Sequence, residues 1–189
     1  MKLIILDRDG VINQESRDYI KSPAEWHPIP GALDAIARLT KAGYTICVAT
    51  NQSGVAREYF SEQGLHDIHD LMLQEVEKRG GKIFKVYYCP HLPNANCNCR
   101  KPATGMFAQM ANDLKLEFKD QKFTPDLGVI FVGDSKCDVE LGLRTGCTFY
   151  LTNGFGSDGD DTLTKLNPSQ IQSITKLKDL ASVVDKVLA

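Results

Sequence analysis

Residues 2–10 read KLIILDRDG, and this stretch decides the fold. After its first residue come four consecutive apolar residues, and charged residues follow immediately. A short apolar run that ends in charge is typical of a buried strand, and such strands occur in parallel sheets that helices cover on both faces. We therefore predict a strand over Lys2–Leu6, with Asp7 and Asp9 just beyond its carboxyl end and Gly10 allowing a sharp turn.

The length and net charge of the chain limit the classes of protein to which it can belong. Its 189 residues are expected to form one domain, residues 1–189, around a single core. A net charge of −2 provides no basic surplus that would indicate a nucleic-acid or membrane partner. No stretch approaches the roughly 18–20 apolar residues of a membrane-spanning helix, and the first apolar run is too short for a signal peptide. We expect a cytoplasmic monomer.

Strand and helix patterns alternate along the rest of the chain. Further strands are predicted over residues 44–49, 83–88, 128–132 and 148–151, and helices over residues 33–39, 61–79, 105–114, 138–145 and 177–188. Alternation of this kind indicates βαβ units and a parallel sheet, so we predict an α/β fold with three Rossmann-like layers.

Polar residues follow each predicted strand at its carboxyl end, which is where ligands bind in such sheets. They are Asp7 and Asp9, then Thr50, Asn51 and Gln52, then Arg100 and Lys101, and last Asp134 with Asp138 one helical turn further on. We expect these side chains to converge on one rim of the sheet.

This set of residue types suits phosphoryl transfer. Asp7, Asp9 and Asp134 offer the oxygen ligands that Mg²⁺ prefers, and the cation would offset the repulsion between a carboxylate and a phosphate. Lys101 and Thr50 can contact the same phosphate oxygens. One carboxylate can act as nucleophile, and a second can donate and later accept a proton. Taken alone, however, Asp-x-Asp-Gly is more often a turn, and Asp134 could equally cap the next helix.

Three of the six cysteines fall within residues 89–100, CPHLPNANCNCR. In a cytosolic protein, clustered cysteines are more often metal ligands than disulfides. The candidate ligands of a structural Zn²⁺ are Cys89, His91, Cys97 and Cys99, which form a closed tetrahedral set. A disulfide and unlinked thiols are the alternatives. A bound ion would clamp the loop that leads directly into Arg100 and Lys101.

The segments LDRDG, VATNQSG, CRKP and FVGDSKCD resemble the four ordered motifs of the haloacid dehalogenase superfamily of phosphatases. The resemblance covers roughly residues 2–151. It implies that Asp7 is the nucleophile, that Asp9 is the general acid and base, and that Thr50 and Lys101 bind the phosphoryl group. It also implies that Asp134 holds Mg²⁺ with Asp7 and the backbone carbonyl of Asp9, while Asp138 supports the metal through water.

Within the superfamily, TNQSGVAR, CPH…CNCRKP and Gly105-Met106 resemble the D-glycero-D-manno-heptose 1,7-bisphosphate 7-phosphatase family. That resemblance implies a zinc loop in place of a large cap domain and a sugar bisphosphate as the small-molecule substrate. It also implies a place in making ADP- or GDP-heptose for lipopolysaccharide. Asn51 and Gln52 would then contact substrate, and Arg57 or Arg100 would hold the second phosphate.

Two alternatives to this family stay open. Histidinol-phosphate phosphatases share the zinc-loop pattern, including CPHLP, and a zinc-stabilised binding module without catalysis is a third class. Among other residues, His66 and His69 are expected on a solvated helix face. Tyr19 and Trp26 are expected to take part in ordinary packing, with the mouth of a site as the alternative.

Overall fold

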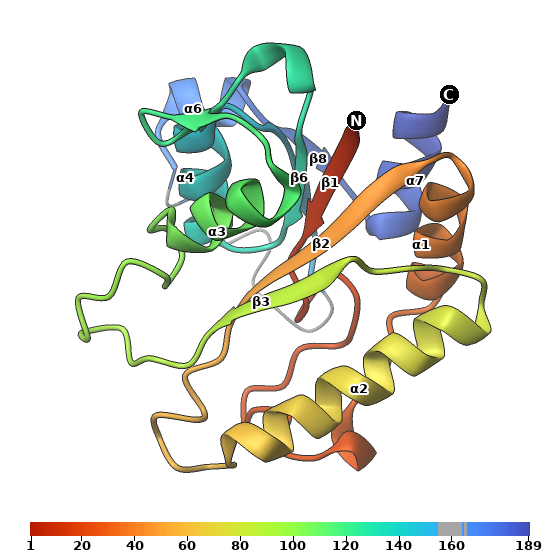
Figure 1. Ribbon diagram of the computed structural model, residues 1–189, viewed down its shortest axis with the longest axis vertical. Helices are drawn as coiled ribbons and strands as arrows, with labels where there is room; N and C mark the ends of the chain where they lie inside the picture. Colours follow the sequence, from red (N-terminus) through yellow and green to blue (C-terminus); the bar gives the residue numbers. More distant parts are fainter. Residues whose placement is uncertain (155–163, 165) are drawn as a thin grey trace.

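A computed structural model describes residues 1–154, 164 and 166–189, and a six-stranded parallel sheet lies at its centre (Figure 1). The strand order is β3-β2-β1-β6-β7-β8. The strands are β1 (Lys2–Leu6), β2 (Tyr44–Asn51), β3 (Lys85–Cys89), β6 (Ile130–Gly133), β7 (Thr148–Thr152) and β8 (Thr175–Leu177). The α/β fold with a parallel sheet is therefore confirmed.

Helices cover both faces of the sheet and make three layers. On one face lie α1 (Ala32–Lys41), α2 (Glu62–Lys78) and α7 (Leu180–Leu188), and on the other lie α3 (Gly105–Leu114) and α4 (Lys136–Thr145). The alternation of side chains along β1 divides the core, because Ile4 and Leu6 pack with the first group of helices and Leu3 and Ile5 with the second. All four side chains are buried, as the quoted stretch predicts.

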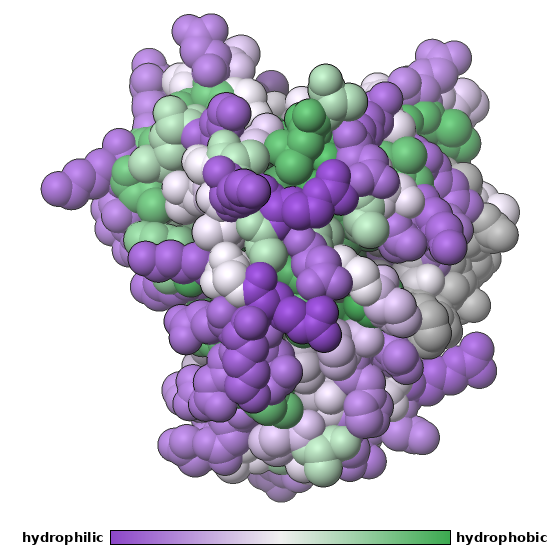
Figure 2. Space-filling model, turned by 90° about the vertical axis from the view of Figure 1, so that its right-hand side faces the viewer, coloured by the Kyte–Doolittle hydropathy of each residue, from purple (hydrophilic) through white to green (hydrophobic). Residues whose placement is uncertain are grey.

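Figure 2 shows the side of the molecule that lies on the right in Figure 1, where α1 and α7 are. Hydrophilic side chains predominate on this face, and hydrophobic residues occur there only in small separate groups. The apolar side chains of α1 and α7, such as Leu33, Ile36 and Val183, are instead buried against the sheet. No helix in the described part of the chain is long and apolar enough to cross a membrane.

The ends of several elements differ from the prediction. The helix predicted over residues 177–188 was wrong at its start, because Leu177 ends strand β8 and the helix begins only at Leu180. Asp179 sets that start, since its side chain accepts a hydrogen bond from the backbone of Ser182 at 2.9 Å. Short elements that no prediction covered are η1 (Pro23–Glu25), β4 (Phe118–Lys119), β5 (Lys122–Phe123), η2 (Pro125–Leu127) and α6 (Pro168–Gln172).

The topology places a binding edge next to β1. The chain runs from β1 outward through β2 to β3, then returns to β6 on the other side of β1. Ligands in such sheets bind outside the carboxyl ends of the strands where the order reverses, which here are β1 and β6. Asp7 follows β1 and Asp134 follows β6. The connection from β1 to β2 holds η1 and α1, and the connection from β6 to β7 holds α4, so neither contains a large cap domain.

Candidate active site

Three carboxylates meet at this edge of the sheet. One oxygen from each of Asp7, Asp134 and Asp138 lies within 4.8 Å of the others, and all three residues are buried. The backbone N–H of Asp7 donates to the carbonyl of Val132 at 2.9 Å, which ties the end of β1 to β6. Gly10 has φ +78, and a Cβ atom there would overlap the carboxylate of Asp134. A glycine is therefore required for the acidic cluster to form.

Asp138 both caps helix α4 and belongs to the acidic cluster. The N-cap residue of α4 is Ser135, so the alternative in which Asp134 caps this helix is wrong. Asp138 completes the cap, because its Oδ2 accepts from the backbone of Ser135 at 3.1 Å. Its Oδ1 lies 2.7 Å from Nζ of Lys101. The cap thus fixes a carboxylate that faces the lysine.

Lys101 is held by three partners and is only 3 % exposed. Its Nζ lies 2.8 Å from Oδ2 of Asp7 and donates to the carbonyl of Ala49 at 2.9 Å, in addition to the contact with Asp138. Burial acts to lower the pKa of Lys101, but the charges of Asp138 and Asp7 outweigh it and the pKa is raised. The lysine is therefore a fixed positive charge beside the predicted nucleophile.

Asn51 connects this lysine to strand β2. Its Oδ1 accepts from the backbone N–H of Lys101 at 3.0 Å, and its Nδ2 donates to the carbonyl of Lys101 at 3.2 Å. One amide side chain thus satisfies both backbone groups of the lysine, as a neighbouring strand would. This contact explains how a residue 50 positions away in the sequence is brought to the carboxyl end of β2.

The acidic cluster has the properties of a cation site. Burial raises the pKa of Asp7 to about 8, where Asp138 adds to the effect and Lys101 opposes it. Burial, followed by the charges of Asp7 and Asp138, raises the pKa of Asp134 well above its ordinary value. One lysine does not neutralise three buried carboxylates. An oxygen-rich, negatively charged and buried site of this kind suits Mg²⁺.

These pKa shifts predict how stability depends on pH without magnesium. Burial raises the pKa of Asp7 from 3.8 in the unfolded chain to about 8, so the folded state holds an extra proton between these values. The free energy of unfolding therefore falls as the pH rises through that window. We expect the melting temperature of protein dialysed free of magnesium to decline between about pH 5 and about pH 8. The decline should be shallower in Asp7→Asn and absent with saturating Mg²⁺; equal slopes in all three samples would contradict this account.

The side chain of Asp9 is held by residues outside the acidic cluster. Its carboxylate accepts from Nε and Nη2 of Arg8 at 3.1 Å and 2.9 Å, from Nδ2 of Asn13 at 2.8 Å and from Nε2 of Gln52 at 2.8 Å. Burial acts to raise the pKa of Asp9, but the charge of Arg8 and these hydrogen bonds outweigh it and lower the pKa. Gln52 also donates to Oγ1 of Thr50 at 2.7 Å, which leaves the hydroxyl hydrogen of Thr50 free to donate elsewhere.

The four predicted zinc ligands also come together. The sulfurs of Cys89, Cys97 and Cys99 lie 3.2–3.6 Å apart, and Nδ1 of His91 lies 3.2 Å from the sulfur of Cys99. These separations are close to the edge of about 3.8 Å of a tetrahedron with Zn–S bonds of about 2.3 Å. They are far longer than a disulfide bond of about 2.05 Å, and all six cysteines are free. The disulfide alternative is therefore not realised, and the donor set fits zinc.

Comparison with known proteins identifies the family. A model of the polynucleotide kinase 3 phosphatase family matches residues 2–173. A D-glycero-beta-D-manno-heptose-1,7-bisphosphate 7-phosphatase of Pseudomonas putida is 43% identical over 188 residues and covers 100% of both chains. The chain belongs to the heptose 1,7-bisphosphate 7-phosphatase family.

A solved structure and a more distant relative extend the comparison. The crystal structure of D,D-heptose 1,7-bisphosphate phosphatase from Bordetella bronchiseptica, complexed with magnesium and phosphate, has a TM-score of 0.88 and 41% identity, covering 100% of this chain and 98% of that one. A D-glycero-alpha-D-manno-heptose-1,7-bisphosphate 7-phosphatase of Campylobacter jejuni is 34% identical over 95% of this chain and 98% of its own. The predicted resemblance, both to the haloacid dehalogenase superfamily and to this family within it, is confirmed.

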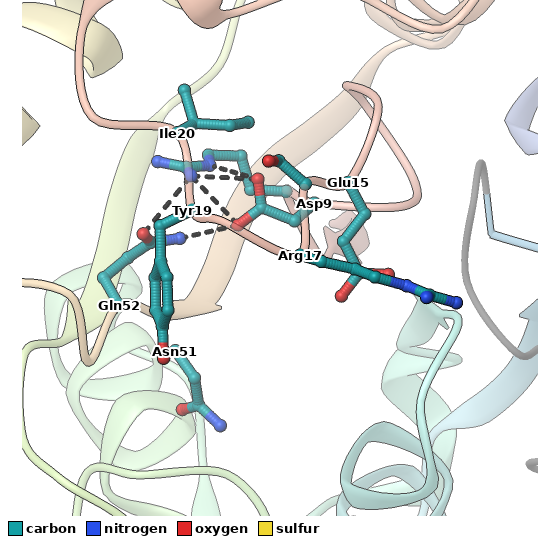
Figure 3. Close-up of a pocket in the computed structure, with 9 residues that line it drawn as sticks. Asp9, Glu15, Arg17, Tyr19, Ile20, Asn51 and Gln52 are labelled. Atoms are coloured by element: carbon teal, nitrogen blue, oxygen red, sulfur yellow. Dashed lines mark hydrogen bonds and ion pairs between the residues drawn. The ribbon is translucent and has the colours of Figure 1, made fainter.

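In this family member, a cavity of about 260 Å³ opens beside Asp9 (Figure 3). Arg17, Tyr19, Asn51 and Gln52 are among the residues that line it. Figure 3 shows Asn51, Gln52 and Tyr19 on one side of the space and Arg17 with Glu15 on the other. Arg17 was not predicted as a site residue, and Tyr19 takes the alternative position at the mouth of a site instead of only ordinary packing. The position of both residues in the connection just after the LDRDG motif was the available signal.

The two arginines proposed from the sequence lie elsewhere. Arg57 is exposed and is not among the described residues that line this cavity. Arg100 lines a separate groove of about 460 Å³ together with Lys101 and Arg144, and its Nη1 donates to the carbonyl of His91 at 3.2 Å. Arg100 thus also fastens the loop that carries the four candidate zinc ligands in this family member.

Proposed function

We propose that residues 1–189 form one phosphatase domain that removes the 7-phosphate from D-glycero-D-manno-heptose 1,7-bisphosphate. The observation that carries the proposal is the cluster of Asp7, Asp134 and Asp138 around the buried Lys101, in a chain that is 43% identical over its full length to a phosphatase of that name. We assign the β anomer, because the relative named for the α anomer is only 34% identical.

In the first step Asp7 attacks the phosphorus of the 7-phosphate through a carboxylate oxygen. A bond forms between that oxygen and phosphorus as the bond from phosphorus to the sugar oxygen breaks. Asp9 gives the departing sugar oxygen the proton that it took from water in the second step of the preceding turnover. Lys101 and the hydroxyl of Thr50 stabilise the charge on the transferring group, and bound Mg²⁺, held by Asp7, Asp134 and the carbonyl of Asp9, would add its own positive charge there.

In the second step water breaks the aspartyl phosphate. Asp9, now ionised, takes a proton from the water, and the oxygen of that water attacks phosphorus. The bond between phosphorus and Asp7 breaks, which frees inorganic phosphate and restores the carboxylate of Asp7. The hydrogen bonds from Arg8, Asn13 and Gln52 favour the ionised form of Asp9, which is the form that this step requires.

The phosphate that stays on the sugar needs its own cation. Two arginines line the cavity: Arg8, whose guanidinium is already bound to Asp9, and Arg17, which lies on the side opposite Gln52. Arg57 and Arg100 are not among the described residues that line it. An arginine suits phosphate because its planar group can bind two oxygens at once. We assign the retained phosphate to Arg17, with Arg57 and Arg100 as the alternatives from the sequence. None of the six cysteines forms a disulfide, which suits a reducing compartment and supports the cytoplasm as the place of action.

Hydrolysis by the purified protein tests the whole proposal. We expect the β bisphosphate to be the best substrate, followed by the α bisphosphate, with histidinol phosphate far behind because its amine would be repelled by the arginines. Arg17→Gln should raise KM for the bisphosphate by about 10-fold or more, the size expected when a charge-assisted pair is lost. The same change should leave KM for an aryl phosphate unaltered.

Arg57→Gln and Arg100→Gln are the matched controls and remove the same charge at the alternative positions. A selective rise of KM in one of them, with Arg17→Gln unaffected, would move the subsite to that residue. Better turnover of histidinol phosphate by the wild type would overturn the substrate, and no phosphate release from any ester would overturn the activity itself.

A further inference from the structure

His69 lies in an unexpected place for a residue on a helix that faces solvent. It was predicted on a solvated face of α2, yet it is only 5 % exposed. Its Nε2 lies 3.2 Å from Nη1 of Arg8, so the side chain is directed toward the residue between the two motif aspartates. The structure thus corrects the interpretation of His69, while His66 on the same helix is exposed as expected.

Arg8 connects His69 to the active site, because it contacts both His69 and Asp9. Its side chain is among the most deeply buried of the described residues, at 1 % exposed. Nε and Nη2 face the carboxylate of Asp9, Nη2 also donates to Oε1 of Gln52 at 3.2 Å, and Nη1 is directed to His69. The planar guanidinium of Arg8 therefore contacts Asp9 through Nε and Nη2 and contacts the imidazole of His69 through Nη1.

The charge state of His69 fits this contact. A guanidinium can only donate, so the imidazole nitrogen that faces it has to accept, which requires a neutral ring. Burial, reinforced by the positive charge of Arg8, lowers the pKa of His69 to about 3. The ring is therefore neutral at physiological pH and can fix the direction of Nη1.

We infer that His69 is a positioning residue for proton transfer: it holds the guanidinium of Arg8 in the orientation that sets the carboxyl group of Asp9. This inference rests on the proposed function of Asp9 as general acid and base. It extends the chain of contacts from α2 through Arg8 and Asp9 to Gln52 and Thr50, so that the proton donor and one phosphate ligand are aligned by one network.

A role in packing alone would not require these residue types. Burying an arginine and an imidazole costs free energy unless their polar atoms are paired, and an apolar side chain would fill the same space at lower cost. A catalytic need to orient Asp9 explains these residue types, because a general acid must lie within hydrogen-bond reach of the oxygen that it protonates.

Leaving groups of different basicity separate the two roles. An alkyl phosphate needs a proton on its departing oxygen, whereas 2,4-dinitrophenolate departs without one. kcat/KM reports on the steps up to cleavage of that bond. General acid–base catalysis is worth about 10²–10⁴-fold in total, so imperfect positioning in His69→Leu should lower kcat/KM for an alkyl phosphate by about 10-fold. The same variant should keep kcat/KM for 2,4-dinitrophenyl phosphate within about twofold.

Two further variants complete the test. His69→Gln retains an acceptor near the position of Nε2 and should restore most of the alkyl phosphate activity. His66→Leu, the same change on the exposed side of α2, should leave both substrates unaffected. The melting curve of His69→Leu will show whether this variant folds. If it does not, His69→Asn replaces it, because the shorter side chain of asparagine does not bring its oxygen within reach of Arg8.

Equal losses on both substrates, or no loss on the alkyl phosphate, would overturn the positioning role of His69. Failure of His69→Gln to recover more activity than the Leu or Asn variant would do the same. A wild type that releases phosphate from neither ester would instead overturn the proposed function, so the two failures are distinguishable.

Discussion

Asp7→Asn is expected to reduce turnover by about 10⁴-fold or more, because loss of a nucleophile that acts together with other groups removes most of the catalysis. An amide oxygen does not attack phosphorus at a useful rate, and neither Asp134 nor Asp138 can replace Asp7. Asp134 follows a different strand, and Asp138 is held by the cap of α4 and by Lys101. Phosphate release from the β bisphosphate and from an aryl phosphate measures the effect.

The loss should not reflect unfolding. Burial disfavours the charged form of Asp7 and outweighs its attraction to Lys101, so an uncharged amide of the same shape fits this position. The variant should therefore melt at the same or a higher temperature than wild type without magnesium. Asp126→Asn, the same change on an exposed residue of η2, should be fully active.

Acid quenching of wild type during turnover tests the covalent step directly. The phosphoryl group should be found on the peptide that contains Asp7 and be absent from the Asp7→Asn variant. Label on no peptide, or an Asp7→Asn variant with more than about one hundredth of wild-type activity, would contradict the covalent mechanism.

Much of the fold could be predicted because the five strands expected from the sequence are largely apolar runs that lead into polar residues. The rule that strand ends converge then placed Asp7, Thr50, Lys101 and Asp134 on one edge, where the structure has them. Strand β8 was missed because it has only three residues, Thr175–Leu177, and just one of them is apolar. Its presence depends on pairing with β7, a long-range contact that no local pattern reveals.

The contacts that hold the site residues in place could not be predicted for a related reason. His69 is separated from Arg8 by 61 positions, and a single histidine on a mostly polar helix is usually solvated. Only the packing of α2 against the sheet brings the two side chains together. Asn51 is a similar case, because it was recognised as part of the site but its bonds to the backbone of Lys101 depend on the path of the cysteine-containing loop before that lysine.

Two features hold the backbone of Lys101 in place in this structure. Asn51 fixes its backbone from strand β2, while the segment that precedes it is shaped by Cys89, His91, Cys97 and Cys99. Cys97 and Cys99 are only partly buried, and few apolar contacts hold the tip of the loop. The loop therefore lacks a core of its own, and we propose that a zinc ion supplies its rigidity.

Cys97→Ser is consequently expected to have the second largest effect. Wild type should contain close to one zinc per chain by elemental analysis, even after dialysis that removes magnesium, and the variant should contain almost none. Loss of a structural metal is among the most damaging single changes, so we expect the melting temperature to fall by about 10 °C or more, at about 2–4 °C per kcal/mol for a chain of this size. Activity should fall as well, because Lys101 follows the loop after only one intervening residue, Arg100.

The activity loss distinguishes anchoring from simple loss of stability. At a temperature where the variant is still folded, kcat should drop by about 10-fold or more, the range seen when the support of a site is removed, and added zinc should not restore it. Asn94→Ser, on an exposed position of the same loop, should keep its zinc and its activity. A zinc-free wild type would remove the basis for the metal. A Cys97→Ser variant that loses zinc yet keeps its melting temperature and kcat would show that Asn51 alone is sufficient to position the lysine.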